Sequence, residues 1–148
     1  MSELPEQAIS RDPAYPHWAR VPTRWHDNDA YGHVNNTVHY LAVDTVVNAW
    51  LIAHAGLDLE HGAVIGLCVE SSCRYVESLS YPDAFDVGLR IGRLGSSSVV
   101  WELALHRASD GAKVADATFV HVFVDRGTRR PVPLPEAMRE PMTSLVRP

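Results

Sequence analysis

The chain has 148 residues, of which 46% are hydrophobic and 21% are charged, and its formal net charge is −5. This length and composition are typical of one globular domain whose core needs no disulfide or structural metal. Because the net charge is negative, no broad basic field is available, which argues against nucleic acid and anionic membranes as partners.

The sequence shows no targeting or membrane-spanning segment. Residues 1–17 are polar, contain three prolines and lack an apolar stretch, so they predict a flexible N-terminal arm rather than a secretory signal. The longest uncharged apolar run, Thr45 to Leu57, is shorter than the ~20 residues that span a bilayer. Cys68 and Cys73 form no CxxC motif and are predicted to point to opposite faces of a strand, which favours a reducing cytoplasm.

A first strand and a long helix are predicted in the N-terminal half. Residues 17–25 mix apolar and polar side chains as a short strand would, and a polar loop follows them. From 37 to 55, apolar residues recur at helical spacing and extend almost all round the helix, which predicts a helix buried on most sides. Asn35 or Asn36 supplies its N-cap, and Gly56 ends it.

The hydrophobic period then changes to two, which predicts four antiparallel strands. They cover residues 65–75, 85–91, 99–105 and 114–125, separated by turn sequences. Pro135 is the predicted first residue of a short helix that ends at Met138. The element order predicts an α+β fold in which an antiparallel sheet wraps around the apolar helix. In the first of these strands one face is predicted to carry Ile65, Leu67, Val69, Ser71, Cys73 and Tyr75.

Acidic residues gather directly before the long helix. Asp27 and Asp29 lie two positions apart, and Gly32 stands between them and the predicted cap. A helix N-terminus presents free backbone N–H groups and a partial positive charge, which suit a developing oxyanion. A carboxylate held nearby can attack a carbonyl, or activate water against it, and Gly32 would let the substrate approach the backbone.

The same residues have other interpretations. They can be purely structural, with Asx turns at Asp27 and Asn28 and a cap at Asn35 or Asn36. A metal site is a further alternative, although no HExxH motif or cysteine pair fixes a geometry, and no later Glu completes a calcium loop. The candidate metal ligands are His26, Asp27, Asp29, His33 and His39. The residue pattern alone leaves these alternatives open.

Residues 24–36 read RWHDNDAYGHVNN and resemble the D-x-D-x-x-G-H-V-N-N signature of hotdog-fold acyl-CoA thioesterases of the 4-hydroxybenzoyl-CoA thioesterase-like family. The resemblance implies a hotdog fold, in which an antiparallel β-sheet wraps around a long central α-helix. It covers most of the chain, with a thioesterase domain at 18–135 between the arm at 1–17 and a C-terminal tail with a short helix at 136–148.

The resemblance also implies a role for each residue of the signature. Asp29 would be the catalytic carboxylate, as a nucleophile or as a general base, whereas Asp27 would fix the turn. The backbone N–H near Asn36 would polarise the thioester carbonyl. Hydrolysis would need no metal and no organic cofactor, and the sites would lie at subunit interfaces of a homodimer or homotetramer. The residues assigned to substrate binding are Gly32, His33, Asn35 and Asn36.

The CoA contacts implied by the family are less complete in this sequence. In some relatives a basic turn between the third and fourth strands holds the nucleotide phosphates, whereas here only Arg93 is charged and Ser96 and Ser97 follow it. We therefore predict CoA contacts from Arg93, Ser96 and Ser97 through side chains and backbone amides. Alternative phosphate partners, or simply a solvated loop, are Arg126, Arg129 and Arg130.

Two rival functions come from other classes. A hotdog hydratase or dehydratase usually has an Asp and a His five positions apart, whereas Asp29 and His33 are four apart. A non-catalytic acyl-binding module would need no carboxylate, and Asp29 is present. An acyl carrier protein is the less natural thioester donor, because this chain is itself acidic. We therefore expect a cytoplasmic acyl-CoA thioesterase whose acyl pocket is lined by the central helix, Cys68 and Val69.

Overall fold

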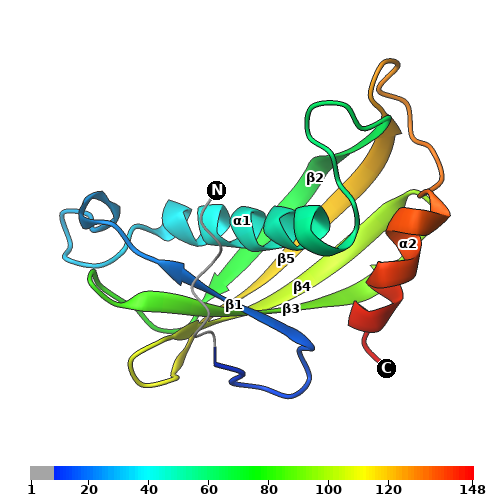
Figure 1. The fold of residues 1–148 in the computed structure, drawn as a ribbon. Helices are drawn as coiled ribbons and strands as arrows, with labels where there is room; N and C mark the ends of the chain where they lie inside the picture. The colour runs from blue at the N-terminus through cyan, green and yellow to red at the C-terminus, as the bar shows by residue number, and fades with distance from the viewer. Residues whose placement is uncertain (1–8) are drawn as a thin grey trace.

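The computed structural model describes residues 9–148, which form one five-stranded antiparallel sheet and two α-helices. The sheet order is β1-β3-β4-β5-β2, and α1 lies across one of its faces (Figure 1). Within residues 9–148, no helix has both the length and the hydropathy of a membrane span. The elements are β1 (His17–Pro22), a 3-10 turn (Trp25–Asp27), α1 (Asn36–His54), β2 (Val64–Tyr75), β3 (Ala84–Leu94), β4 (Ser98–Arg107), β5 (Lys113–Asp125), α2 (Glu136–Met142) and a final 3-10 turn (Thr143–Leu145).

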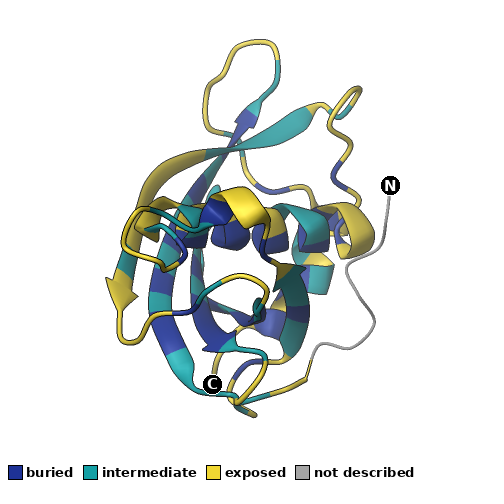
Figure 2. Ribbon diagram, turned by 90° about the vertical axis from the view of Figure 1, so that its left-hand side faces the viewer, coloured by how far each residue is buried: buried dark blue, intermediate teal, exposed yellow. Residues whose placement is uncertain are grey.

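The core fills the space between α1 and the sheet (Figure 2). Inward side chains of β3 and β4 meet the apolar face of α1, and the Trp50 ring packs edge-on against Trp101 with centroids 6.0 Å apart. Burying a large apolar side chain stabilises the fold by roughly 1.5–3 kcal/mol, so this layer positions the helix. The predicted ends of α1 are confirmed: Asn35 is the N-cap, and Gly56 follows the C-cap with φ +68°.

The register of β2 differs from the predicted alternation. Its pairing with β5 shifts between Cys68 and Glu70, which marks a β-bulge. Cys68 faces His121 before the shift and Cys73 faces Ala117 after it, so both cysteines lie on the helix-facing side. The prediction that they point to opposite faces is therefore wrong. The prediction of one shared face is also wrong, because Ile65 and Leu67 point away from α1 whereas Ser71, Cys73 and Tyr75 face it.

The C-terminal segment packs onto the domain. Pro135 is the residue before α2 rather than its first helical residue, and α2 continues past the predicted end at Met138 to Met142. The helix persists beyond Pro141 because Met142 is fully buried in the core, and such packing overrides a poor local propensity. Residues 136–148 therefore contribute to the core, and the domain boundaries remain predictions.

The segment before β1 also contacts the sheet, on the face opposite α1. Residues 1–8 of the predicted arm lie outside the described residues, but Arg11 reaches Asp86 of β3. Asp86 is fully buried and accepts from Arg20 Nε at 2.8 Å and from Arg11 Nη2 at 3.1 Å. Two guanidinium groups thus compensate one buried carboxylate and join β1, β3 and the preceding segment.

His121 is a buried histidine in the middle of β5. Its Nδ1 accepts a hydrogen bond from Trp101 Nε1 at 3.2 Å, so the neutral ring carries its proton on Nε2. Burial disfavours the imidazolium form and lowers the pKa of His121 to about 4.

We expect the free energy of unfolding to decrease as the pH falls from about 6.5 towards 4. Over that range the unfolded chain binds a proton at residue 121 that the folded chain does not, with a slope of up to about 1.4 kcal/mol per pH unit. Urea unfolding at several pH values should show a smaller slope for His121→Gln than for the parent chain. Equal slopes would contradict the lowered pKa of His121 as the cause of this pH dependence.

Candidate functional site

The loop between the 3-10 turn and α1 is a tight reverse turn. Asp29 N–H donates to the His33 carbonyl at 2.9 Å, and Gly32 N–H donates to the Asp29 carbonyl at 3.0 Å. Gly32 has φ +84°, a conformation that side-chain-bearing residues rarely adopt. The Gly32 carbonyl accepts from Ser80 Oγ at 2.8 Å, and Val34 N–H donates to the Leu79 carbonyl at 2.8 Å. The loop is thereby fixed to the segment before β3.

Asp27 closes the base of this loop. It is buried, accepts from Arg24 N–H at 2.7 Å and forms an ion pair with the Arg24 guanidinium at 3.0 Å. Its own carbonyl accepts from Asn35 N–H at 2.8 Å. Both carboxylate oxygens are thus used within the turn, and the predicted turn-fixing role of Asp27 is confirmed.

Asp29 is held by its neighbours in the loop. Its Oδ1 accepts from Tyr31 N–H at 2.9 Å and its Oδ2 accepts from Asn35 Nδ2 at 3.2 Å. Asn35 also caps α1, because its Oδ1 accepts from Thr37 N–H at 3.0 Å. One amide side chain therefore links the acid to the start of the helix.

The start of α1 leaves a backbone donor beside this acid. Thr37 and Val38 N–H groups are satisfied by the side chain and the carbonyl of Asn35. The N–H of Asn36, the first helical residue, has no hydrogen-bond partner in the part of the chain that the structure describes. The positive end of a 19-residue helix adds to the field at this position.

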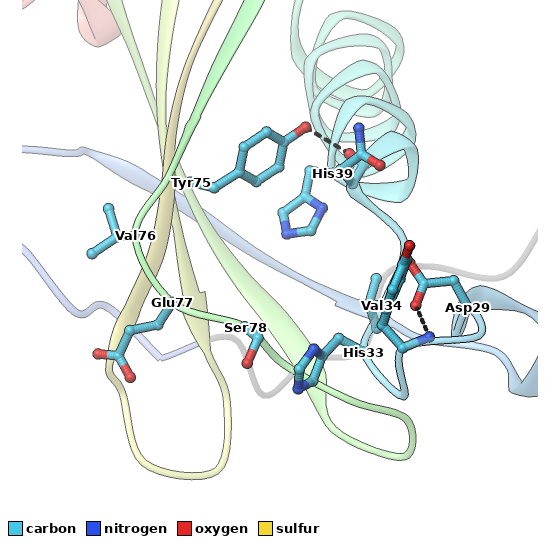
Figure 3. Close-up of a pocket in the computed structure, with 10 residues that line it drawn as sticks. Asp29, His33, Val34, His39, Tyr75, Val76, Glu77 and Ser78 are labelled. Carbon is cyan, nitrogen blue, oxygen red and sulfur yellow. Dashed lines mark hydrogen bonds between the residues drawn. The ribbon is translucent and has the colours of Figure 1, made fainter.

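A cavity of about 420 Å³ opens between this loop, the first turn of α1 and the end of β2 (Figure 3). On one side it contains the Asp29 carboxylate and on the other the phenol of Tyr75, which donates to the Asn36 carbonyl at 2.8 Å. Its complete lining is Asp29, Tyr31, His33, Val34, Asn36, His39, Tyr75, Val76, Glu77 and Ser78.

His39 forms part of the cavity wall one helical turn from Asn36. The ring is buried and stands edge-on to Tyr75 and Phe85, with centroids 4.9 Å and 5.2 Å away. Burial lowers the pKa of His39, so the ring is neutral near neutral pH. His39 was a candidate metal ligand in the sequence, but within residues 9–148 no cluster of three or more acidic, His or Cys side chains suits a metal.

The structure brings most of the predicted site together. Asp29, His33 and Asn36 line the cavity, while Gly32 shapes the turn and Asn35 supports it from behind. Sequence reasoning missed the contributions of β2 and of the segment after it. Cys68 and Val69, the predicted pocket residues of that strand, are not among the cavity-lining residues. The residues of β2 and of the segment after it that line the cavity are Tyr75, Val76, Glu77 and Ser78.

The predicted CoA-binding residues lie elsewhere in the chain. Arg93 lies near the end of β3, and Ser96 and Ser97 lie in the turn that follows it. This turn packs beside α2 through a hydrogen bond from Arg139 to the Gly95 carbonyl. Figure 1 shows α2 and the start of α1 at opposite ends of the sheet. Within one chain, the turn is therefore not part of the Asp29 cavity.

The alternative phosphate partners after β5 are partly committed to other contacts. The Arg126 guanidinium donates to the Leu59 and Gly62 carbonyls, which fixes the loop after α1. Arg129 and Arg130 are exposed in the turn that follows β5.

Comparisons with known proteins agree with this geometry. Residues 23–142 match the family model described as Thioesterase-like superfamily. The PA5185 protein from Pseudomonas aeruginosa is 47% identical, with 90% of this chain and 94% of that chain covered at a TM-score of 0.87. PA2801 from the same species, provisionally named a thioesterase, is 34% identical over 85% of this chain and 97% of its own, with a TM-score of 0.79.

A more distant structure shows a likeness of fold. Slr0204, a 1,4-dihydroxy-2-naphthoyl-CoA thioesterase from Synechocystis, is 19% identical, with 88% of this chain and 98% of that chain covered at a TM-score of 0.78. No curated protein matches the chain.

Proposed function

The chain belongs to the thioesterase-like superfamily, and from this premise we propose that it hydrolyses acyl-CoA thioesters to a free acid and CoA. The observation that carries the proposal is that Asn36, whose N–H has no hydrogen-bond partner within residues 9–148, lines the same cavity as Asp29. The fold that supports it is a hotdog, with the sheet wrapped around α1 as its central helix. Slr0204, which shares this fold, acts on an acyl-CoA, which supports the choice of thioester.

The Asn36 N–H is the proposed donor to the thioester carbonyl oxygen. Negative charge develops on that oxygen when a nucleophile adds to the carbonyl carbon, and a fixed donor at a helix N-terminus stabilises it. Because the donor is a backbone group, the Asn36 side chain is not required for the reaction. His33, which lines the cavity, and Gly32, which shapes the turn, complete the proposed substrate-binding loop.

Asp29 is the proposed catalytic residue, and two routes use it. As a general base it takes a proton from water, whose oxygen bonds to the carbonyl carbon; the C–S bond then breaks and the leaving thiolate regains that proton. As a nucleophile its oxygen forms a mixed anhydride as the thiolate leaves, and water then hydrolyses the anhydride. In a single turnover in ¹⁸O-labelled water, label in Asp29 would establish the anhydride route, because water has then attacked the Asp29 side of the anhydride. Label in the acid product alone is expected both from the general-base route and from attack on the acyl side of the anhydride.

A second copy of the chain is the proposed partner. Among the strands of residues 9–148, β2 is an edge strand with one unpaired side, and its Val69 and Tyr75 side chains are exposed. Because Tyr75 also lines the cavity, a homodimer or homotetramer that covers this edge would place the site at a subunit interface. The proposed CoA contacts of Arg93, Ser96 and Ser97 would then come from another subunit. The proposed location is the cytoplasm.

The proposal is tested by measuring thiol release from short, medium, long and aromatic acyl-CoAs. We expect hydrolysis of at least one class with no added metal or cofactor, and the preferred class identifies the substrate. If the folded protein binds these thioesters but releases no thiol, the hydrolase proposal is wrong and a binding module takes its place. Release of water from a 3-hydroxyacyl thioester, or addition of water to an enoyl thioester, would instead indicate a dehydratase or hydratase.

A further inference from the structure

Tyr75 connects the edge strand to the first turn of α1. It is the last residue of β2, and its hydroxyl donates to the Asn36 carbonyl at 2.8 Å, a contact between residues 39 positions apart (Figure 3). In the α-helical pattern the same carbonyl also accepts from the N–H of Tyr40. The phenol therefore adds a tertiary hydrogen bond to a residue in the part of a helix that most readily frays.

The direction of the Tyr75 ring is fixed by packing. Its plane is at 87° to the His39 ring, with centroids 4.9 Å apart, and His39 in turn packs at 70° to Phe85 of β3. Tyr75 is 44% exposed, but its ring packs against the buried His39, and the hydrogen bond to the Asn36 carbonyl sets the direction of its hydroxyl. Burial raises the pKa of Tyr75 to about 12, so the phenol is protonated and able to donate throughout the pH range of an assay.

We propose that Tyr75 is a positioning residue for hydrolysis, because it holds Asn36 so that its backbone N–H meets the thioester carbonyl opposite Asp29. The inference rests on the proposed function and deepens it. Polarisation of a carbonyl requires a donor at a defined distance from the oxygen, and a displacement of about 1 Å can lower the rate about 100-fold. Because Tyr75 acts through Asn36, removing its hydroxyl should reduce stabilisation of the transition state more than it reduces the affinity for substrate.

The test is Tyr75→Phe, which keeps the ring against His39 and removes only the hydroxyl. We expect kcat to fall about tenfold with KM within about twofold of the parent value. Amide hydrogen exchange at Tyr40 should become faster, since the first turn of α1 loses an anchor. The matched control is Tyr40→Phe, a tyrosine on the same turn whose hydroxyl has no hydrogen-bond partner in the described chain, and it should behave as the parent.

A second replacement separates the hydrogen bond from the rest of the side chain. 4-Aminophenylalanine at position 75 keeps the ring and offers an N–H donor to the Asn36 carbonyl, so we expect it to recover most of the kcat. Unchanged kcat in Tyr75→Phe, or a raised KM with kcat retained, would overturn the proposal, the latter because it indicates a substrate contact. These results are distinct from failure of the proposed function, in which the parent chain itself releases no thiol.

Discussion

Replacing Asp29 by Asn should lower kcat/KM for acyl-CoA hydrolysis at least about 100-fold. The substitution removes the negative charge that both proposed routes require, as nucleophile or as base. It also alters the local hydrogen bonds, because an amide accepts through one oxygen only, whereas Asp29 accepts from Tyr31 N–H and from Asn35 Nδ2. Thermal unfolding of the variant must therefore be measured beside its kinetics, with Asp29→Ala as a second variant free of the amide.

Asp44→Asn is the matched control for this experiment. Asp44 is an exposed carboxylate on α1 that accepts from Asn48 Nδ2 at 3.0 Å and does not line the Asp29 cavity. We expect it to retain parental kcat/KM. If both Asp29 variants fold and hydrolyse thioesters as fast as the parent, another group performs the reaction, and Asp29 is a structural residue of the loop.

Replacing Asp86 by Asn should destabilise the protein by about 3–5 kcal/mol, because it leaves the two arginines of a buried ion pair without a counter-charge. Asp86 is fully buried, and its oxygens accept from both Arg11 and Arg20. The amide that replaces the carboxylate would direct its own N–H groups at a guanidinium. Urea unfolding at neutral pH measures the loss as a lower transition midpoint.

Asp110→Asn provides the comparison for Asp86. Asp110 also pairs with an arginine, accepting from Arg107 Nη2 at 2.7 Å, but it is exposed to solvent. Water and salt screen such a pair, so we expect almost no change in the midpoint. Equal effects of the two substitutions would show that burial does not set the strength of these ion pairs.

The sequence predicted elements whose causes are local. α1 could be placed because Asn35 provides a cap, Gly56 permits a left-handed residue after the helix, and the apolar spacing between them is helical. The bulge in β2 could not be placed, because the alternation of residue types continues through Cys68 and Glu70 without interruption. Only the pairing with β5 reveals the extra residue.

The same contrast between local and long-range causes applies to the candidate site. Asp29 and Asn36 lie within one short segment, so a motif is enough to bring them together. Tyr75 joins them, and contacts His39, through the packing of a strand end on a helix start, and nothing in the spacing of these residues indicates that contact. The distance of Arg93 from the cavity likewise follows from the path of β3 across the sheet, which the turn sequence itself does not encode.

Asn35 has two hydrogen-bonding tasks with opposite polarity, and this limits which residues the position can accept. Its side-chain oxygen caps the start of α1 by accepting from Thr37 N–H, while its side-chain nitrogen donates to Asp29. Aspartate and serine are as good at capping helices in general. At this position aspartate would set a second anion against Asp29, and the single short hydroxyl of serine would replace two divergent polar groups. We therefore expect a survey of functional substitutions here to retain the amide, for a reason that helix stability alone would not reveal.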